Sequence, residues 1–264
     1  MQIVDNIHEA LWKGKLYIME IIRQIKYHKI LYDSVVFNHK YSSDNSRCFI
    51  IGNGPSLRIE DLEKISSNRD VSFAANRIYN IFSETSWRPT YYGVCDIRLY
   101  KNSKNEIDNV PGIKFLPLDL FSQYAEDKRN DYFVFSRVPV TFFNRPPRFS
   151  DSFVVRFGEG GTITYHFLQM AAAMGFKEIF LIGVDFSFTH GIGPDGKYFE
   201  DKTIKYNHYS KDNSPLDTVP NLYNQIRAYT KANEYAESHG IHIYNATRGG
   251  KLEVFKRVDF DTLF

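Results

Sequence analysis

The chain has 264 residues, of which 43% are hydrophobic and 24% are charged, and its net charge at pH 7 is +2. This length and composition are typical of one α/β domain with a substantial core, and they argue against a long disordered region. Because the charge is nearly balanced and no dense basic block or zinc-finger spacing is present, we expect no nucleic-acid partner.

Two cysteines, Cys48 and Cys95, fall inside predicted strands. They are therefore expected to be buried thiols, and a disulfide framework is excluded in practice. The N-terminus lacks the apolar run and the small-residue cleavage site of a secretory signal, and no stretch reaches the roughly 18 apolar residues of a membrane span. These features predict a cytoplasmic protein.

Residues 1–45 are predicted to form a helical N-terminal extension. Apolar residues recur there at helical spacing, and lysines and arginines make the segment locally basic. Such a helix can rest on an anionic membrane surface, so peripheral contact with the inner face of a membrane stays open. Packing on the core or on another subunit is the favoured interpretation. An apolar extension that needs cover predicts a homo-oligomer.

From Cys48 onward, strand and helix patterns alternate, which is typical of a doubly wound, mostly parallel α/β sheet. The predicted strands span residues 48–51, 71–75, 91–95, 113–116, 153–156, 178–182 and 241–244. Residues 119–150 look less regular. We therefore assign residues 46–264 to one Rossmann-like domain.

A glycine turn follows the first predicted strand, with the sequence Gly52-Asn53-Gly54-Pro55-Ser56. Ser56 is expected to cap a helix, whose free N–H groups and positive dipole end suit a phosphate. The glycines let a ligand approach the backbone, and the Asn53 side chain is expected to be free for it. The dinucleotide and P-loop fingerprints are absent, so a tight turn without a ligand is the alternative.

Other polar side chains follow neighbouring predicted strands. Asn76 and Asp96 come directly after residues 71–75 and 91–95, and Asp185 follows residues 178–182. The carboxyl ends of parallel strands meet at the sheet edge where open α/β sheets bind ligands. Gly161 and Thr162 begin a second glycine-turned helix there. Asp185 has an alternative role, which is to cap the next turn or to bond backbone N–H groups.

Residues 186–220 are predicted to form a lid, because a loop of this length is usually functional. The lid contains Tyr198, His208 and Tyr209. Arg248 follows the last predicted strand in a glycine-rich turn, and it is either a phosphate or acceptor contact or part of a surface turn.

Several motifs carry a resemblance to a known family. They are the glycine turn, Ala75-Asn76-Arg77, Gly160-Gly161-Thr162, Gly183-Val184-Asp185-Phe186, Asn207-His208-Tyr209 and Asn245-Ala246-Thr247-Arg248-Gly249-Gly250. From about residue 45 onward the chain resembles the MptE-like family, which is named for archaeal 6-hydroxymethylpterin diphosphokinase and whose bacterial members belong mostly to surface-polysaccharide loci. The motif order is also similar to that of bacterial CMP-sialic-acid transferases and of the central domain of motility accessory factors.

The resemblance implies a sialyltransferase-like fold and a set of site residues. It implies contacts to the CMP portion from residues Gly52, Asn53, Gly54, Ser56, Asn76, Gly161 and Thr162. It makes His208 the general base on the acceptor hydroxyl, and a neutral histidine titrates in the range that this role needs. It places Tyr198, and less directly Tyr209 and Arg248, near the leaving phosphate or the acceptor.

The chain departs from the sialyltransferases at two positions. Ser187 stands where they have a tyrosine that steadies the leaving phosphate, and Asp96 stands where they have an asparagine. A carboxylate at this place tolerates Mg²⁺ better than it tolerates a bare phosphate. These differences put the CMP-sialate donor in question.

Three functions are therefore weighed. The leading one is an inverting glycosyltransferase of capsule or lipopolysaccharide synthesis, which takes a sugar from a nucleotide-activated donor to a glycan or glycolipid acceptor without a cofactor. The second is Mg²⁺-dependent diphosphate transfer from ATP to a pterin alcohol, with Asp96 and Asp185 on the metal. The third is a nucleotide-sugar-binding accessory protein without catalysis.

Overall fold

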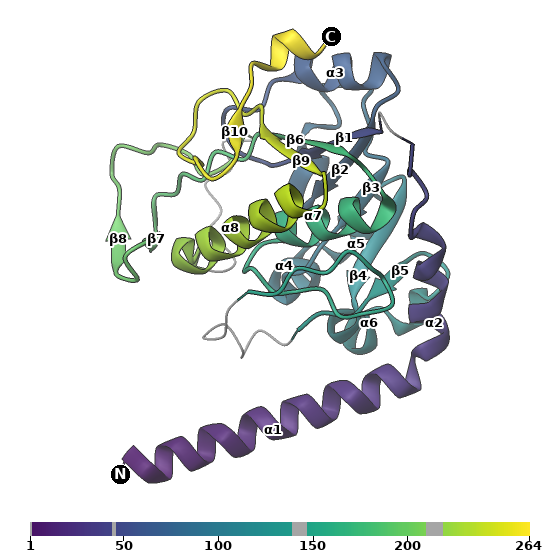
Figure 1. Cartoon of the computed structure of the whole chain (residues 1–264), viewed down its shortest axis with the longest axis vertical. Helices are drawn as coiled ribbons and strands as arrows, with labels where there is room; N and C mark the ends of the chain where they lie inside the picture. Colours follow the sequence, from purple (N-terminus) through teal and green to yellow (C-terminus); the bar gives the residue numbers. More distant parts are fainter. Residues whose placement is uncertain (1, 44–45, 139–146, 210–218) are drawn as a thin grey trace.

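A computed structural model describes residues 2–43, 46–138, 147–209 and 219–264 (Figure 1). Its centre is one parallel sheet with the strand order β10-β9-β6-β1-β2-β3-β4-β5. The strands are β1 (Arg47–Ile51), β2 (Val71–Ala75), β3 (Tyr91–Gly93), β4 (Ile113–Pro117), β5 (Phe133–Phe135), β6 (Glu178–Ile182), β9 (His242–Asn245) and β10 (Lys256–Arg257). The predicted doubly wound, mostly parallel sheet is confirmed.

The middle of the sheet is formed by β1, which pairs with β2 on one side and β6 on the other. Its residues Cys48–Ile51 are buried, as expected for a strand that helices cover on both faces. The side chains alternate between the two faces, so Cys48 and Ile50 belong to one apolar core while Phe49 and Ile51 belong to the other.

Helices cover both faces of the sheet. One core contains residues of α7 (Ile163–Met174) and α8 (Leu222–Ser238), which lie together across the sheet in Figure 1. The other core contains residues of α3 (Ile59–Ser67), α4 (Ile97–Asn102), α5 (Lys104–Asp108), α6 (Leu118–Tyr124) and the 3-10 helix η2 (Asn76–Ile81). Every residue of α7 is buried, which agrees with its apolar sequence.

The first segment of the chain is helical. It consists of α1 (Gln2–Lys26), α2 (His28–Asp33) and the 3-10 turn η1 (Ser34–Phe37). Figure 1 shows α1 at one end of the molecule, on the far side from the C-terminus and α3. No helix in the four described stretches is long and apolar enough to cross a membrane.

The prediction of a strand at residues 153–156 was wrong. Residues 153–156 form a turn, in which Val154 and Val155 are exposed, so their β-branched side chains do not mark a buried strand. The edge strand β5 instead comes from the stretch that looked irregular, and it pairs with β4. The same stretch contains α6 and the 3-10 helix η3 (Glu126–Lys128). Residues 139–146 lie outside the described part.

The segment predicted as a lid contains a short antiparallel hairpin. Its strands are β7 (His190–Ile192) and β8 (Tyr198–Glu200), which form a separate two-stranded sheet. Ile192 also makes a parallel bridge to Asn221, the residue that caps α8. The hairpin projects to one side of the main sheet in Figure 1. Residues 210–218 of the predicted lid lie outside the described residues.

Candidate functional site

The glycine turn after β1 packs directly on the turn after β6. The Gly52 N–H donates to the Ile182 carbonyl and the Gly54 N–H donates to the Gly183 carbonyl, both at 2.8 Å. A Cβ atom on Gly52 would overlap the Gly183 carbonyl, and one on Gly54 would overlap the Asp185 carboxylate. The close approach that these glycines allow is therefore to the neighbouring turn, and their N–H groups are already bonded.

Ser56 does not begin the next helix, as the sequence had suggested. The helix α3 starts at Ile59, and no side chain caps it. Ser56 instead donates through its Oγ to Asp185 Oδ2 at 2.7 Å and through its backbone N–H to Asp185 Oδ1 at 3.2 Å. Burial raises the pKa of Asp185, and the hydrogen bonds from Ser56 oppose this shift. Asp185 thus bonds a backbone N–H group, which was its alternative role.

The two asparagines lie at the carboxyl end of β1 and β2. The Asn53 side chain, which was expected to be free, donates through Nδ2 to the Ala75 carbonyl at 3.0 Å. Asn76 has a positive φ of 55°, and its carbonyl accepts a hydrogen bond from the Tyr92 hydroxyl at 2.6 Å. These bonds connect the glycine turn with the end of β2. Both asparagines therefore lie at the carboxyl edge of the sheet, where they were predicted.

Asp96 follows β3 and caps a short helix. Its Oδ1 accepts from the backbone N–H groups of Arg98 and Leu99, at 2.7 and 3.0 Å, at the start of α4. The carboxylate therefore has a structural role in the fold. Its expected contact with a nucleotide stays a prediction.

The second glycine turn also has an internal partner for its N–H groups. Glu159 Oε1 accepts from the backbone of Gly160 and Gly161, at 3.1 and 2.9 Å. A helix does begin at this turn, as predicted, and Thr162 caps α7 through a hydrogen bond that its Oγ1 accepts from the Thr164 N–H. The donors expected to face a nucleotide are thus bonded to a carboxylate in this structure.

A buried charged cluster lies beside this turn, and no sequence motif indicated it. We call it the Arg137 cluster; it contains Cys95, Asp119, Arg137, Glu159 and His166. Arg137 Nε and Nη2 donate to both oxygens of Asp119, at 3.0 and 2.8 Å, and Nη1 donates to Glu159 at 3.2 Å. Another bond, from Nη2 to the Cys95 carbonyl at 3.4 Å, joins Arg137 to the end of β3.

Electrostatics keep Arg137 and Asp119 charged within the Arg137 cluster. Burial opposes ionisation at Asp119, but Arg137 outweighs it and holds the Asp119 pKa below its ordinary value. Burial lowers the pKa of His166, so this imidazole is neutral near pH 7. His166 Nε2 has no hydrogen-bond partner in the described structure. No local sequence signal marks this cluster, because it needs β4, β5 and α7 to meet.

The segment that carries His208 lies against the glycine turn. The Tyr209 N–H donates to the Asn53 carbonyl at 2.8 Å. Asn207 and Thr189 exchange two hydrogen bonds, at 2.8 and 3.1 Å, which tie the same segment to the turn before β7. His208, which is half-buried, therefore sits between two anchored neighbours at the edge of the main sheet. The Tyr209 hydroxyl donates to Glu84 at 3.2 Å.

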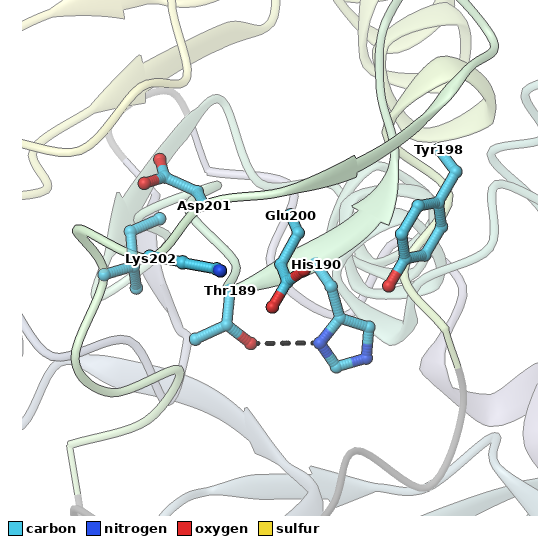
Figure 2. A pocket seen from close by; sticks show the side chains of 7 residues that line it. Thr189, His190, Tyr198, Glu200, Asp201 and Lys202 are labelled. Carbon is cyan, nitrogen blue, oxygen red and sulfur yellow. Dashed lines mark hydrogen bonds between the residues drawn. The ribbon is translucent and has the colours of Figure 1, made fainter.

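A pocket of about 500 Å³ adjoins this segment at the hairpin. Its lining is polar except for Ile204 and consists of Thr189, His190, Tyr198, Glu200, Asp201, Lys202 and Ile204. Figure 2 shows the side chains of His190, Glu200 and Tyr198 on one side of it, with Thr189 bonded to His190 Nδ1 at 3.1 Å. Because Thr189 is also bonded to Asn207, the pocket is linked directly to the segment that carries His208.

A family model described as 6-hydroxymethylpterin diphosphokinase MptE-like matches residues 20–191, which is more than half of the sequence. The chain belongs to the MptE-like family. None of the curated proteins that were compared matches this MptE-like chain.

Solved structures that are similar in fold to this MptE-like protein include one glycosyltransferase. It is described as a MAf glycosyltransferase from Magnetospirillum magneticum AMB-1, and it matches with 14% sequence identity and a TM-score of 0.50. The match covers 90% of this chain and 39% of that chain, so the MptE-like chain spans well under half the length of the glycosyltransferase. At this identity the likeness establishes the fold.

The family match includes only part of the candidate site. It covers the two glycine turns, Asn76, Asp96 and Asp185, and it ends at Gly191. Tyr198, His208 and Arg248 lie beyond it. The link between these later residues and the edge of the sheet therefore rests on the structure of this MptE-like chain.

Arg248 is engaged in a salt-bridge network within the fold. Its Nε and Nη2 donate to both oxygens of the buried Asp61 at 2.9 Å, and Nη1 and Nη2 donate to Asp261 at 2.8 Å. The hydrogen bonds that Arg248 donates to the carboxylates of Asp61 and Asp261 raise the Arg248 pKa. The structure thus gives Arg248 a role in joining α3 to the C-terminal 3-10 turn η5 (Phe260–Leu263). These contacts account for the position of the Arg248 side chain, and its contact with a ligand stays a prediction.

The two carboxylates that were expected to hold a metal ion, Asp96 and Asp185, have separate roles in the fold. Asp96 caps α4, whereas Asp185 binds Ser56. In the part of the chain that the structure describes, no three His, Cys, Asp or Glu side chains group as metal ligands. Mg²⁺ often takes one or two carboxylates and fills its other positions with water and substrate phosphate, so a substrate-dependent site stays a prediction.

Proposed function

We propose that this MptE-like protein is a glycosyltransferase that moves a sugar from a CMP-linked donor to a hydroxyl group of a glycan or glycolipid in bacterial surface-polysaccharide synthesis. One observation carries the proposal: the Tyr209 N–H bonds the Asn53 carbonyl, which holds the segment of His208 against the glycine turn. A histidine anchored at the ligand-binding edge of an α/β sheet is well placed for proton transfer. The fold shared with a protein described as a glycosyltransferase also supports this function.

The donor's nucleoside is proposed to lie along the edge formed by Asn53, Asn76 and Asp185. The N–H groups of Gly52 and Gly54 are bonded to carbonyl groups, so they do not serve the phosphate as the sequence had suggested. The Asp185 carboxylate, which faces the glycine turn, suits the hydroxyl groups of a ribose better than it suits an anion.

The reacting ends of donor and acceptor are proposed to meet at the hairpin pocket. Its Lys202 ammonium and Tyr198 hydroxyl supply positive potential and a donor for the leaving CMP phosphate. The Glu200 carboxylate can accept hydrogen bonds from acceptor hydroxyl groups. No metal ion is required by this arrangement.

The proposed transfer step is a direct displacement with His208 as the base. The acceptor oxygen attacks the anomeric carbon, the bond from that carbon to the phosphate oxygen breaks, and the acceptor proton passes to His208. Attack from the face opposite the leaving group inverts the anomeric configuration. A general base of this kind contributes about 10²–10⁴-fold to a rate.

The test is CMP release from CMP-N-acetylneuraminic acid, with lactose as acceptor, in EDTA. His208→Ala is expected to lower turnover by about 10²-fold or more while CMP binding persists. His239→Ala is the matched control, because His239 is exposed at the end of α8, and it should keep wild-type turnover. Loss of turnover in His190→Ala with full activity in His208→Ala would overturn the assignment of the base.

A second candidate is favoured by the description of the family model, which names a 6-hydroxymethylpterin diphosphokinase. Such an enzyme would transfer the terminal diphosphate of ATP to a pterin hydroxyl and release AMP, with Mg²⁺ held by Asp96 or Asp185. AMP formation that needs both Mg²⁺ and 6-hydroxymethylpterin, and that is lost in Asp96→Asn, would establish this function.

A protein that binds CMP tightly but transfers to no acceptor, and whose biological output survives His208→Ala, would instead be a binding accessory.

A further inference from the structure

The helix α1 presents an apolar face to solvent. Eight large apolar side chains of its described part are exposed: Leu11, Trp12, Tyr17, Ile18, Met19, Ile21, Ile22 and Ile25. Ile25 is 69% exposed and Leu11 is 67% exposed. Monomeric proteins seldom expose so many contiguous apolar side chains, and such patches usually mark an interface.

The opposite face of α1 is polar and packs on the body of the protein. Glu20 is 4% exposed, pairs with Arg23 at 2.9 Å and accepts a hydrogen bond from Ser136. Gln24 accepts another from Arg156 at 3.1 Å. The helix is therefore inverted relative to an ordinary surface helix, which buries its apolar stripe on its own domain. The residues of its own domain that the structure describes leave this apolar face exposed.

The exposed apolar residues have the spacing of a helix-to-helix seam. Leu11, Ile18 and Ile25 are seven residues apart, and Ile22 follows Ile18 by four. A seven-residue repeat keeps side chains in register with a second helix along the whole length, whereas contact with a lipid surface does not require it. Gly14 lies on this face, and a Cβ there would meet nothing within 4 Å, so a second helix can approach closely.

Charge favours a protein partner over a membrane. Of the four basic residues from Leu11 to Lys26, Lys13 and Arg23 are only partly exposed, whereas Lys15 and Lys26 are exposed. Lys26, which is exposed, pairs with Glu126 at 3.3 Å. Each lysine or arginine near an anionic bilayer contributes about 1 kcal/mol, so this face would gain little from that attraction.

The area is also sufficient for a stable contact. The 25 residues of α1 span about 37 Å at 1.5 Å per residue. Eight half-exposed large side chains offer about 100 Å² each, or about 800 Å² per copy, which is the contribution of one partner to a standard interface.

We propose that α1 pairs with α1 of a second copy of this chain, along a seam centred on Ile18, to form a two-fold symmetric dimer. A single apolar stripe is self-complementary under two-fold symmetry, so both copies bury the same residues. The seam lies on α1, away from the hairpin pocket, so pairing leaves the pocket open.

Light scattering coupled to gel filtration of the full chain at micromolar concentration tests the proposal. The wild type is expected at twice the 30.8 kDa chain mass and Ile18→Glu at the chain mass, with unchanged far-UV circular dichroism. Val219→Glu is the matched control, because Val219 is an exposed apolar residue outside α1, and it should stay dimeric. A monomeric wild type, or an Ile18→Glu variant that remains dimeric, would overturn the seam.

Two further measurements keep the result decisive. Ile18→Cys is expected to form a disulfide between copies under mild oxidation; the native Cys48 is buried, and Cys95, which is partly exposed, is replaced by serine in every cysteine variant. If the helices are parallel, Leu11→Cys and Ile25→Cys will also cross-link, and if they are antiparallel only Ile18→Cys will. No cross-link at any of the three positions contradicts the proposal. A monomer that sediments with phosphatidylserine vesicles, and loses this in Ile18→Glu, would assign the face to lipid.

Discussion

Removing the guanidinium of the Arg137 cluster tests whether this cluster holds the sheet edge together. In Arg137→Met the side chain keeps a similar length, but Asp119 and Glu159 lose hydrogen bonds of 2.8 to 3.2 Å from one buried cation. Breaking a buried ion pair by removal of one partner costs about 3–5 kcal/mol, because a buried charge is left uncompensated. Most domains have only about 5–15 kcal/mol of stability, so the loss should be easy to measure.

The loss should also depend on pH. In the wild type, Arg137 lowers the Asp119 pKa below the unfolded value of 3.8, so its stabilisation is present above that pH and lost as the pH falls through the folded pKa. Without Arg137, the burial that opposes ionisation of Asp119 is no longer outweighed, so the folded pKa of Asp119 rises. Protonation then relieves the variant, and its deficit should shrink between about pH 7 and pH 5.

Urea unfolding followed by circular dichroism at both pH values is the assay. Arg137→Met combined with Asp119→Asn and Glu159→Gln should recover much of the stability at pH 7, since neutral groups do not need the cation. A loss below about 1 kcal/mol for Arg137→Met, equal at both pH values, would refute the reasoning.

Two other substitutions give sharp outcomes. Gly54→Ala places a methyl group against the Asp185 carboxylate and is expected to lower the free energy of unfolding in urea by about 1–3 kcal/mol. Part of this loss should be recovered in the double variant with Asp185→Ala. An unchanged free energy of unfolding would contradict the packing of the two turns. Arg248→Ala leaves the buried Asp61 without its bidentate partner and should lower the free energy of unfolding by about 1–3 kcal/mol, with CMP affinity unchanged. Lys64→Ala is the control, because it removes only an exposed pair and should lower the free energy of unfolding by less than about 1 kcal/mol. A stable Arg248→Ala variant that no longer binds CMP would return Arg248 to the ligand site.

Elements whose signals are local could be predicted from the sequence. Thr162 and Gly175 bound α7, and Asn221 caps α8, because a capping residue acts within a few positions of the helix it ends. The buried strands near the centre of the sheet were also evident, since an apolar run of four or five residues between turns has few other uses.

Features that depend on distant segments could not be predicted. Ser56 has the residue type of a helix cap, but it binds Asp185 in the turn after β6 instead. The local preference of serine for a cap therefore does not determine where the helix begins. The strand β5 has only three residues and is defined by its pairing with β4. The periodicity of α1 predicted its helix, whereas which face meets the protein depends on Glu20 finding partners far along the chain.

Calorimetric titration of CMP into the purified protein, in EDTA and again with Mg²⁺, tests the central claim most directly. A nucleotide site at the edge formed by Asn53, Asn76 and Asp185 predicts saturable CMP binding that ignores EDTA and persists in His208→Ala. Absence of CMP binding, or binding of ATP alone that appears only with Mg²⁺, would contradict the account.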